Sequence, residues 1–220
     1  MVAPCAHWLN NSKTVPEFNA GCRTCPRLAL YLDQIKQEKP DYFAAPVPAF
    51  GDAKPQLLIV GLAPGMHGAN RTGRPFTGDA SGHLLYQTLF DLGLASAPQS
   101  NSADDGLKLF GVHITNAVKC LPPQNAPTTA EIRNCLPYLL EEINNLPEDC
   151  NLLALGKLAH DAILRAYDLK LSVLKFAHAA EHLLPDGRKL IDSYHCSRYN
   201  TQTKRLTALM FKDVIQKAVE

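Results

Sequence analysis

Short aliphatic runs alternate with helix-like segments along most of the chain, and this alternation most constrains the fold. The runs occur at residues 57–60, 111–118, 152–155 and 189–194, and segments with helical spacing follow them. Strands separated by helices favour a parallel sheet that is covered on both faces. The sequence therefore predicts an α/β fold, a three-layer αβα sandwich with a central, mostly parallel four-stranded sheet.

The 220 residues provide enough chain for one domain with a sizeable core, and length alone does not require a second domain. We therefore expect a single domain over residues 1–220, with an irregular N-terminal segment at residues 1–20. Neither a signal-peptide core near Met1 nor an apolar run of membrane-spanning length is visible. This pattern predicts a cytoplasmic protein that does not associate with a membrane.

The connection that follows the first aliphatic run is unusually long. It covers Gly61–Asp79, whereas about two to six residues are usual between a strand and the next helix. In open α/β sheets, the carboxyl ends of the strands form the ligand-binding edge. The loop combines several glycines with Arg71, Arg74, Phe76 and Asp79, a set that suits a flat ligand attached to phosphate. Asp79 fits two roles, as the cap of the following helix or as a chemical group in the site.

The net charge of +1 gives no general sign of nucleic-acid binding. Basic side chains nevertheless fall inside or beside the candidate loops, and this placement is compatible with phosphate contact on one face. They are Arg71, Arg74, Lys119, Arg198, Lys204 and Arg205.

Four of the seven cysteines form a pattern that is typical of a metal site. Cys22 and Cys25 make a CxxC turn before a predicted helix, while Cys120 follows the second predicted strand and Cys135 lies in the next helix. Clustered thiols in a cytoplasmic chain bind metal more often than they form disulfides. The spacing does not distinguish zinc from an iron–sulfur cluster. The alternative is that the four cysteines are ordinary core residues that bind no metal.

Three further side chains are expected to join Asp79 at the strand ends. Phe76 offers a stacking face, and Asn116 offers a donor and an acceptor in one plane, which matches the edge of a pyrimidine. His195, at the end of the fourth predicted strand, is placed to donate a hydrogen bond to a departing anion. Taken singly, Asn116 and His195 are also ordinary buried residues, so their joint placement is what indicates a site.

The C-terminal part of the chain contains one ambiguous segment, residues 176–184. His178 and His182 lie four residues apart, a spacing that binds metal on a helix. A histidine-bearing surface segment is the favoured interpretation, because no third ligand lies nearby in the sequence. After the last aliphatic run, the sequence predicts one final helix from about Thr201 to Val219.

Three stretches together resemble the signature blocks of the uracil-DNA glycosylase superfamily, in particular its type 5 (UDGb) branch of iron–sulfur enzymes. They are GLAPGMHGANRTGRPFTGD from residue 61, TNAVKCLPPQNAPT from residue 115 and HCSRYNTQTKRLT from residue 195. The resemblance runs from Cys22 to about Leu206. It implies a monofunctional DNA repair glycosylase that removes uracil and other deaminated or modified bases from double-stranded DNA and leaves an abasic site. We expect this enzyme to be a monomer.

The resemblance also implies roles for individual side chains. Phe76 would stack on the flipped base, Asn116 would read its edge, and His195 would stabilise the departing base while Asp79 assists at the sugar. A [4Fe-4S] cluster would be held by Cys22, Cys25, Cys120 and Cys135. Substrate would also lie against Gly61, Leu62, Ala63, Pro64 and Gly65, and DNA would contact Arg71, Arg198, Tyr199 and Asn200.

Two other classes of function remain open. One is a non-catalytic DNA-binding module with a structural metal, because Leu62 stands where most other branches carry a polar water-activating residue, although the type 5 branch shows Leu there. The other is a cysteine-dependent hydrolase that uses Cys196. A dyad of Cys196 with His195 is disfavoured, because neighbours in an extended segment point to opposite sides.

Overall fold

The structure of the protein is a computed structural model, and it describes residues 17–220. The predicted irregular segment, residues 1–20, lies outside this range except for residues 17–20, which belong to no helix or strand.

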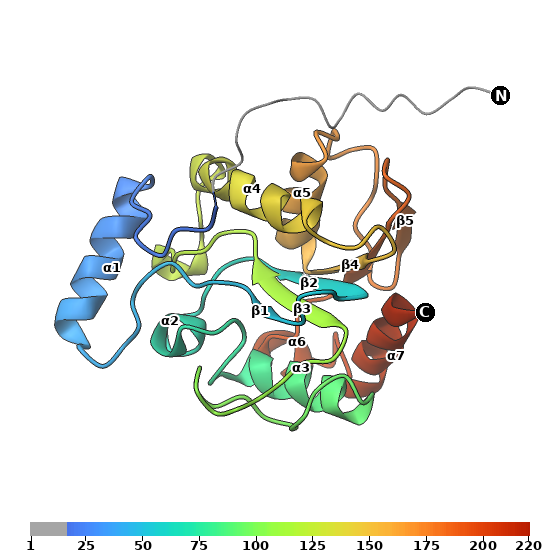
Figure 1. Cartoon of the computed structure of the whole chain (residues 1–220), viewed down its shortest axis with the longest axis horizontal. Helices are drawn as coiled ribbons and strands as arrows, with labels where there is room; N and C mark the ends of the chain where they lie inside the picture. Colours follow the sequence, from blue (N-terminus) through green and yellow to red (C-terminus); the bar gives the residue numbers. More distant parts are fainter. Residues whose placement is uncertain (1–16) are drawn as a thin grey trace.

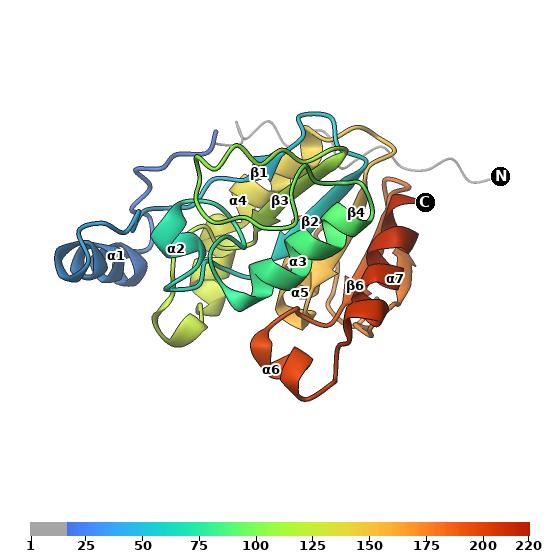
Figure 2. The same cartoon turned by 90° about the horizontal axis from the view of Figure 1, so that it is seen from below.

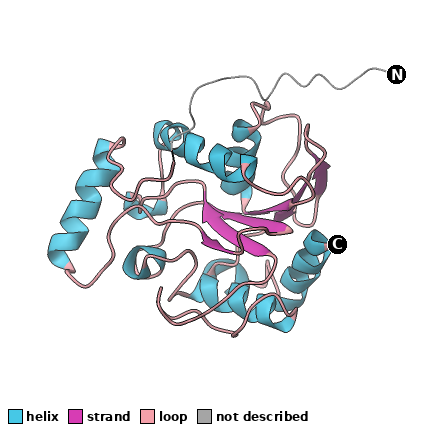
Figure 3. Cartoon of the chain, viewed as in Figure 1, coloured by secondary structure: helices cyan, strands magenta, loops and turns pink. Residues whose placement is uncertain are grey.

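Six strands form one sheet with the order β1-β3-β2-β4-β6-β5 (Figures 1 and 3). The central four are parallel, and each coincides with one of the predicted aliphatic runs. β2 is buried at every residue and pairs with both β3 and β4. The prediction of an α/β fold is confirmed. The bounds are β2 Leu57–Gly61, β3 Val112–Asn116, β4 Asn151–Leu155 and β6 Lys189–Ser193.

The prediction of a four-stranded sheet was wrong, because a short antiparallel strand is added at each edge. β1 Phe50–Gly51 pairs with β3, and β5 Glu181–Leu183 pairs with β6. Strands this short carry too little alternation for a sequence pattern to reveal them. They also leave few unpaired backbone groups at the edges of the sheet. The sheet is therefore mixed, with a parallel centre.

The segment 176–184 is not helical either. His182 lies in β5 and His178 precedes it in a turn, so the two do not form a helical metal pair. His178 Nδ1 accepts a hydrogen bond from the backbone N–H of Tyr194 at 3.2 Å. The His182 side chain is 12% exposed and contacts Asp192. The surface interpretation was wrong for His182, because the edge strand folds back onto the sheet.

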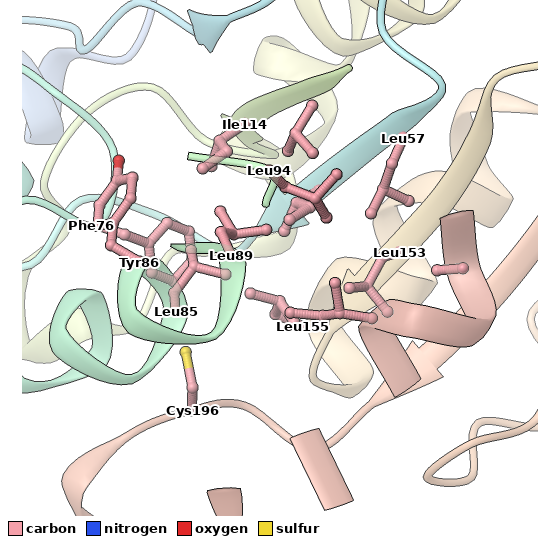
Figure 4. Close-up of a cluster of buried hydrophobic side chains, with 14 of the residues drawn as sticks. Leu57, Phe76, Leu85, Tyr86, Leu89, Leu94, Ile114, Leu153, Leu155 and Cys196 are labelled. Atoms are coloured by element: carbon pink, nitrogen blue, oxygen red, sulfur yellow. The ribbon is translucent and has the colours of Figure 1, made fainter. Parts of the chain in front are cut away.

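Helices cover both faces of the sheet and close two separate cores (Figures 1 and 2). On one face, alternate strand residues such as Leu57 and Ile59 pack against α3 and α7, and Figure 4 shows this core around Leu85 and Leu89 of α3. On the other face, Leu58 and Val60 pack against α4 and α5. The bounds are α3 Ala80–Asp91, α4 Thr129–Asn144, α5 Lys157–Ala166 and α7 Ala208–Val219.

The remaining helices lie outside these layers. α1 Pro26–Glu38 packs Leu32 and Ile35 against Leu121, at one end of the molecule (Figure 1). α2 Ala69–Thr72 lies inside the long loop after β2, and a single 3-10 turn covers Pro123–Asn125. None of the helices within residues 17–220 is long and apolar enough to cross a membrane.

The predicted final helix is divided in two. α6 Arg198–Gln202 ends before residues 203–207, where Lys204 has a positive φ of 57° and Leu206 is buried. Ser197 and Thr207 each accept a hydrogen bond from the first turn of the helix that follows. The cap at Thr207 starts α7 as a separate helix, so α6 is a short helix that begins three residues after His195.

Candidate active site

A cavity of about 390 Å³ lies where the loops after β2, β3 and β6 meet. All four members of the predicted polar constellation line it. The structure therefore brings together residues that are far apart in the sequence. The lining residues are Leu62, Ala63, Gly65, Ala69, Phe76, Asp79, Ser81, Asn116, Asn125, His195 and Ser197.

Gly61 provides the floor against which two of these side chains lie. It ends β2 directly beside Asn116, the last residue of β3. A methyl group on Gly61 would clash with Asn116 Oδ1 and would lie 2.7 Å from Phe76 Cζ. Only glycine therefore permits both side chains to approach the strand this closely. Pro64, which was also expected near the substrate, is buried and does not line the cavity.

Phe76 and His195 form one wall of the cavity. Their ring centroids are 6.0 Å apart and their planes differ by 30°. Phe76 is 7% exposed and has a positive φ of 52°, a conformation that costs an ordinary residue free energy. Strain of this kind persists where the surroundings impose it, and it is concentrated at functional sites.

Asp79 caps α3 and also lines the cavity. Its Oδ1 atom accepts a hydrogen bond from the Gly82 N–H at 2.9 Å and caps α3. Its Oδ2 atom points the other way, towards Gly65 and Gly68, and the side chain lines the cavity. A Cβ at Gly68 would clash with Oδ2, so this glycine makes room for the carboxylate. The cap therefore orients a charge towards the cavity.

His195 is deeply enclosed, and burial lowers its pKa below the ordinary value although the charge of Asp79 acts in the opposite direction. The imidazole is therefore neutral at neutral pH. Cys196, the next residue, points away into the core beside Leu85 (Figure 4) and is fully buried. Burial raises the pKa of the Cys196 thiol. A thiol without solvent access or thiolate character does not serve as a nucleophile, so the cysteine-hydrolase hypothesis was wrong.

The predicted DNA-contacting residues differ in how free their side chains are. Arg198 and Tyr199 are exposed on α6, Tyr199 by 69%. Asn200 instead donates from Nδ2 to the carbonyl oxygen of His195 at 2.8 Å, which braces the loop. Arg71 donates to the carbonyl oxygens of His67 and Gly78 and braces the long loop in the same way.

Two basic residues that were expected near phosphate are buried instead. Arg74 pairs with Asp105 at 2.6 Å and lies over the ring of Phe50. Lys119 pairs with Glu142 at 2.6 Å and is 1% exposed. Both charges are neutralised by residues distant in the sequence, so the local clustering of basic residues overstated the positive surface.

The four predicted metal-ligand cysteines line a second, apolar pocket. Burial, together with the neighbouring thiols, raises the pKa of Cys120 to about 12, and burial raises that of Cys135 to about 11. Cys135 Sγ accepts a hydrogen bond from the Lys119 N–H at 3.3 Å, and Cys25 Sγ accepts one from Asn134 Nδ2 at 3.5 Å.

Sequence reasoning missed several cavity residues. Asn125 follows Gln124, and both have positive φ angles, 55° and 56°. Ser81, Ser197 and Ala69 also line the cavity. The proline-rich stretch around Asn125 signalled an irregular loop, but only the fold places its tip over the strand ends.

An α/β fold with a polar cavity at the carboxyl ends of parallel strands defines a class of protein, and comparison with known sequences gives the family. Residues 48–219 match the uracil DNA glycosylase superfamily, so the chain belongs to this superfamily.

Curated relatives place the chain near one branch of the superfamily. It is 48% identical over 202 residues to the type-5 uracil-DNA glycosylase of Thermus thermophilus, which covers 90% of this chain and 92% of that protein. It is 42% identical over 201 residues to the type-5 enzyme of Pyrobaculum aerophilum, with coverage of 90% and 87%. It is 41% identical over 216 residues to that of Mycobacterium leprae, with coverage of 93% and 94%. The expected resemblance to the type 5 branch is confirmed, and with it the expectation of a DNA glycosylase.

Proposed function

We propose that this protein removes uracil and other deaminated or modified bases from double-stranded DNA and leaves an abasic site. The observation that carries the proposal is the single cavity in which Phe76, Asn116, Asp79 and His195 meet. A base inside a duplex is out of reach of these side chains, so the target nucleotide must flip out of the stack to enter.

Phe76 and Asn116 would hold the flipped base. The ring of Phe76 provides a stacking surface, and the Asn116 amide provides a donor and an acceptor for the base edge. Asn116 is 3% exposed, so a base that fails to pair with its amide leaves a buried polar group unsatisfied. This penalty favours uracil over bases with a different edge.

His195 and Asp79 would act on the reaction itself. The bond between C1′ and the base nitrogen breaks, and the base leaves with the electron pair as an anion. A neutral His195 donates a hydrogen bond to this anion, and such a bond is stronger in the transition state than in the bound substrate. The Asp79 carboxylate stabilises the positive charge that develops on the sugar or orients the water whose oxygen bonds to C1′.

The substrate range should be broad, because Leu62 and Ala63 offer the cavity no polar side chain. Recognition then depends on stacking, which tolerates many ring shapes. A panel of duplexes carrying uracil, hypoxanthine, ethenocytosine or hydroxymethyluracil tests this in single-turnover reactions. Asn116→Ala is expected to slow uracil excision more than excision of the other bases. Strict specificity of the parent for uracil would contradict the proposal.

We also infer that the four cysteines hold a [4Fe-4S] cluster. Burial raises the pKa values of the Cys120 and Cys135 thiols, so these two ionise readily only beside a bound cation, and the N–H groups directed at Cys25 and Cys135 suit metal-bound thiolates. The choice of an iron–sulfur cluster over a zinc ion follows the resemblance of the chain to the type 5 branch. Bound iron and sulfide would act as a clip that joins the N-terminal end of α1, the loop after β3 and α4.

Base removal is separable from DNA binding by one assay. Incubation with a uracil-containing duplex followed by alkali cleaves the strand only where a base has been removed. The parent is expected to yield scission, and a non-catalytic DNA-binding module would yield none. His195→Ala should reduce the single-turnover rate by about 10²–10³ without abolishing duplex binding. The matched control is His178→Ala, which removes a histidine outside the cavity.

We expect the active species to be a monomer. Gel filtration of the protein with and without duplex tests this expectation.

A further inference from the structure

A second group of potential metal ligands lies outside the cavity and away from the cysteines. His160 of α5, His182 of β5 and Asp192 of β6 each place one ligand atom within 4.8 Å of the others. His160 and Asp192 are 1% and 0% exposed, and His182 is 12% exposed. These residues lie at the edge of the sheet that carries β5 (Figure 1).

The contacts of His160 place the lone pair of its Nδ1 atom against a carboxylate oxygen. Nε2 lies 3.1 Å from the carbonyl oxygen of Leu174, which only accepts, so Nε2 carries a hydrogen. Nδ1 lies 2.8 Å from Asp192 Oδ1, which as a carboxylate oxygen also only accepts. A bare nitrogen lone pair would repel this oxygen. A proton on Nδ1, a proton on the Asp192 carboxyl group or a metal ion between the two atoms removes this repulsion.

The second oxygen of Asp192 is also contacted by an imidazole nitrogen. His182 Nε2 lies 3.1 Å from Asp192 Oδ2, and the backbone N–H of Ala177 donates to Oδ2 at 3.4 Å. Two imidazoles and one carboxylate thus converge in a partly enclosed position on three different elements. Histidine nitrogens and a carboxylate oxygen are a common ligand set for zinc in proteins, whereas magnesium and calcium prefer oxygen ligands.

We propose that His160 Nδ1, His182 Nε2 and the Asp192 carboxylate form a binding site for a divalent transition metal of the zinc class. In such a site, the Leu174 carbonyl oxygen accepts a hydrogen bond from the N–H of His160 Nε2 and so orients the ring whose other nitrogen binds the metal. His182, the most exposed of the three, provides the access. On binding of Zn²⁺, a proton on His160 Nδ1 is released to solvent, and His182 takes the tautomer with its hydrogen on Nδ1 so that the Nε2 lone pair binds the metal; no oxidation or reduction occurs.

The site would connect the periphery of the sheet to the cavity. Asp192 lies on β6, three residues before His195, which follows the end of that strand, and the three-residue strand β5 pairs with β6. A metal bound here pins β5 and the segment around Leu174 to the strand that leads into His195. The site is therefore structural, and it is independent of the cysteine pocket and of the excision reaction.

Metal analysis of the intact iron-containing protein tests the proposal. Anaerobic protein is dialysed against Zn²⁺ buffered by a competing chelator, and zinc and iron are counted per chain. One zinc is expected in addition to an unchanged iron content, with X-ray absorption at the zinc edge showing nitrogen and oxygen ligands but no sulfur. His182→Gln, a change at the partly exposed edge strand, should weaken zinc binding by at least about tenfold. His178→Gln is the matched control, since it removes a histidine four residues away and should leave zinc binding unchanged.

Three results would overturn the proposal. They are sulfur ligands at the zinc edge, zinc binding no tighter in the parent than in His182→Gln, and the absence of any chelator-resistant zinc. In the last case, the three side chains form a charged hydrogen-bond network only. Asp192→Asn provides a second variant, expected to lose zinc and to abolish the rise in melting temperature that zinc produces in the parent. Uracil excision is measured separately, so failure here leaves the proposed glycosylase activity untouched.

Discussion

His195 is the residue whose protonation most affects the proposed reaction. Because burial lowers its pKa, the folded protein keeps the imidazole neutral at a pH where an exposed histidine takes up a proton. The unfolded chain, with a histidine pKa of about 6.5, binds the proton first. Stability conferred by the neutral form is therefore present above about pH 6.5 and declines as the pH falls through that value.

The excision rate should follow the folded-state pKa of His195. We expect single-turnover rates on uracil-containing duplex to remain level from about pH 8 through about pH 6.5 and to decline only at lower pH. Circular dichroism at each pH serves as the control that the protein stays folded. A rate that has already halved at about pH 6.5 would show that burial does not lower this pKa.

Asp79 combines a structural and a chemical role that two substitutions separate. Asp79→Asn keeps an oxygen that caps α3 but removes the charge, while Asp79→Ala removes both. Excision of every base should therefore slow in both variants. The free energy of unfolding should fall by about 1 kcal/mol in Asp79→Ala alone. Denaturant unfolding and single-turnover rates measure the two effects, and an Asp79→Asn enzyme as fast as the parent would remove the chemical role.

At the scale of elements, α6 is the structure best placed to enter DNA. It begins at Arg198, with only two residues between its first residue and His195, and it presents Tyr199 to solvent. The hydrogen bond from Asn200 to the His195 carbonyl oxygen holds α6 against this loop. An exposed aromatic ring with an adjacent cation fits the role of a wedge that fills the space left by a flipped base.

Arg198→Ala should weaken binding to paired DNA more than binding to single strands, because only the duplex requires a wedge. Arg133→Ala on α4 removes the same charge from another exposed position and is the matched control. Equilibrium binding to a duplex and to the corresponding single strand measures the difference. Equal losses on both substrates would count against the assignment of α6.

At the scale of the whole molecule, the cysteine pocket joins the N-terminal end of α1, which lies outside the layers on the sheet, to the loop after β3 and to α4. α1 packs on the rest of the protein through a small apolar cluster, and Cys22 and Cys25 lie at its N-terminal end. Cys120 from the loop after β3 and Cys135 from α4 complete the pocket. Loss of the metal should therefore loosen the N-terminal part of the described chain while the central sheet remains.

Cys135→Ala should lose bound iron and lower the melting temperature, because metal-binding free energy contributes to folding. Cys150→Ala removes another buried cysteine that does not line the pocket, so it should retain iron. Metal analysis and thermal unfolding of anaerobic protein compare the two variants. Stoichiometric zinc in place of iron in the parent would contradict the cluster assignment.

The sequence by itself determined the parallel centre of the sheet and four side chains of the cavity, those of Phe76, Asp79, Asn116 and His195. Aliphatic runs such as 57–60 are local patterns, and parallel strands bring their carboxyl ends to one edge. Asp79, Asn116 and His195 follow such runs. Once the runs are assigned to parallel strands, these three residues are expected at the same edge of the sheet. The caps at Asp79 and Thr128 are equally local, and both are present in the structure.

Only the tertiary structure decided which polar side chains are free. Arg74 pairs with Asp105, and Lys119 pairs with Glu142. The residues next to Arg74 and Lys119 in the sequence give no sign of these partners. His182 meets its ligand-bearing neighbours through β5, a strand too short to leave a sequence pattern. These outcomes depend on contacts between residues that are distant in the chain, and such contacts are set by packing, not by local propensity.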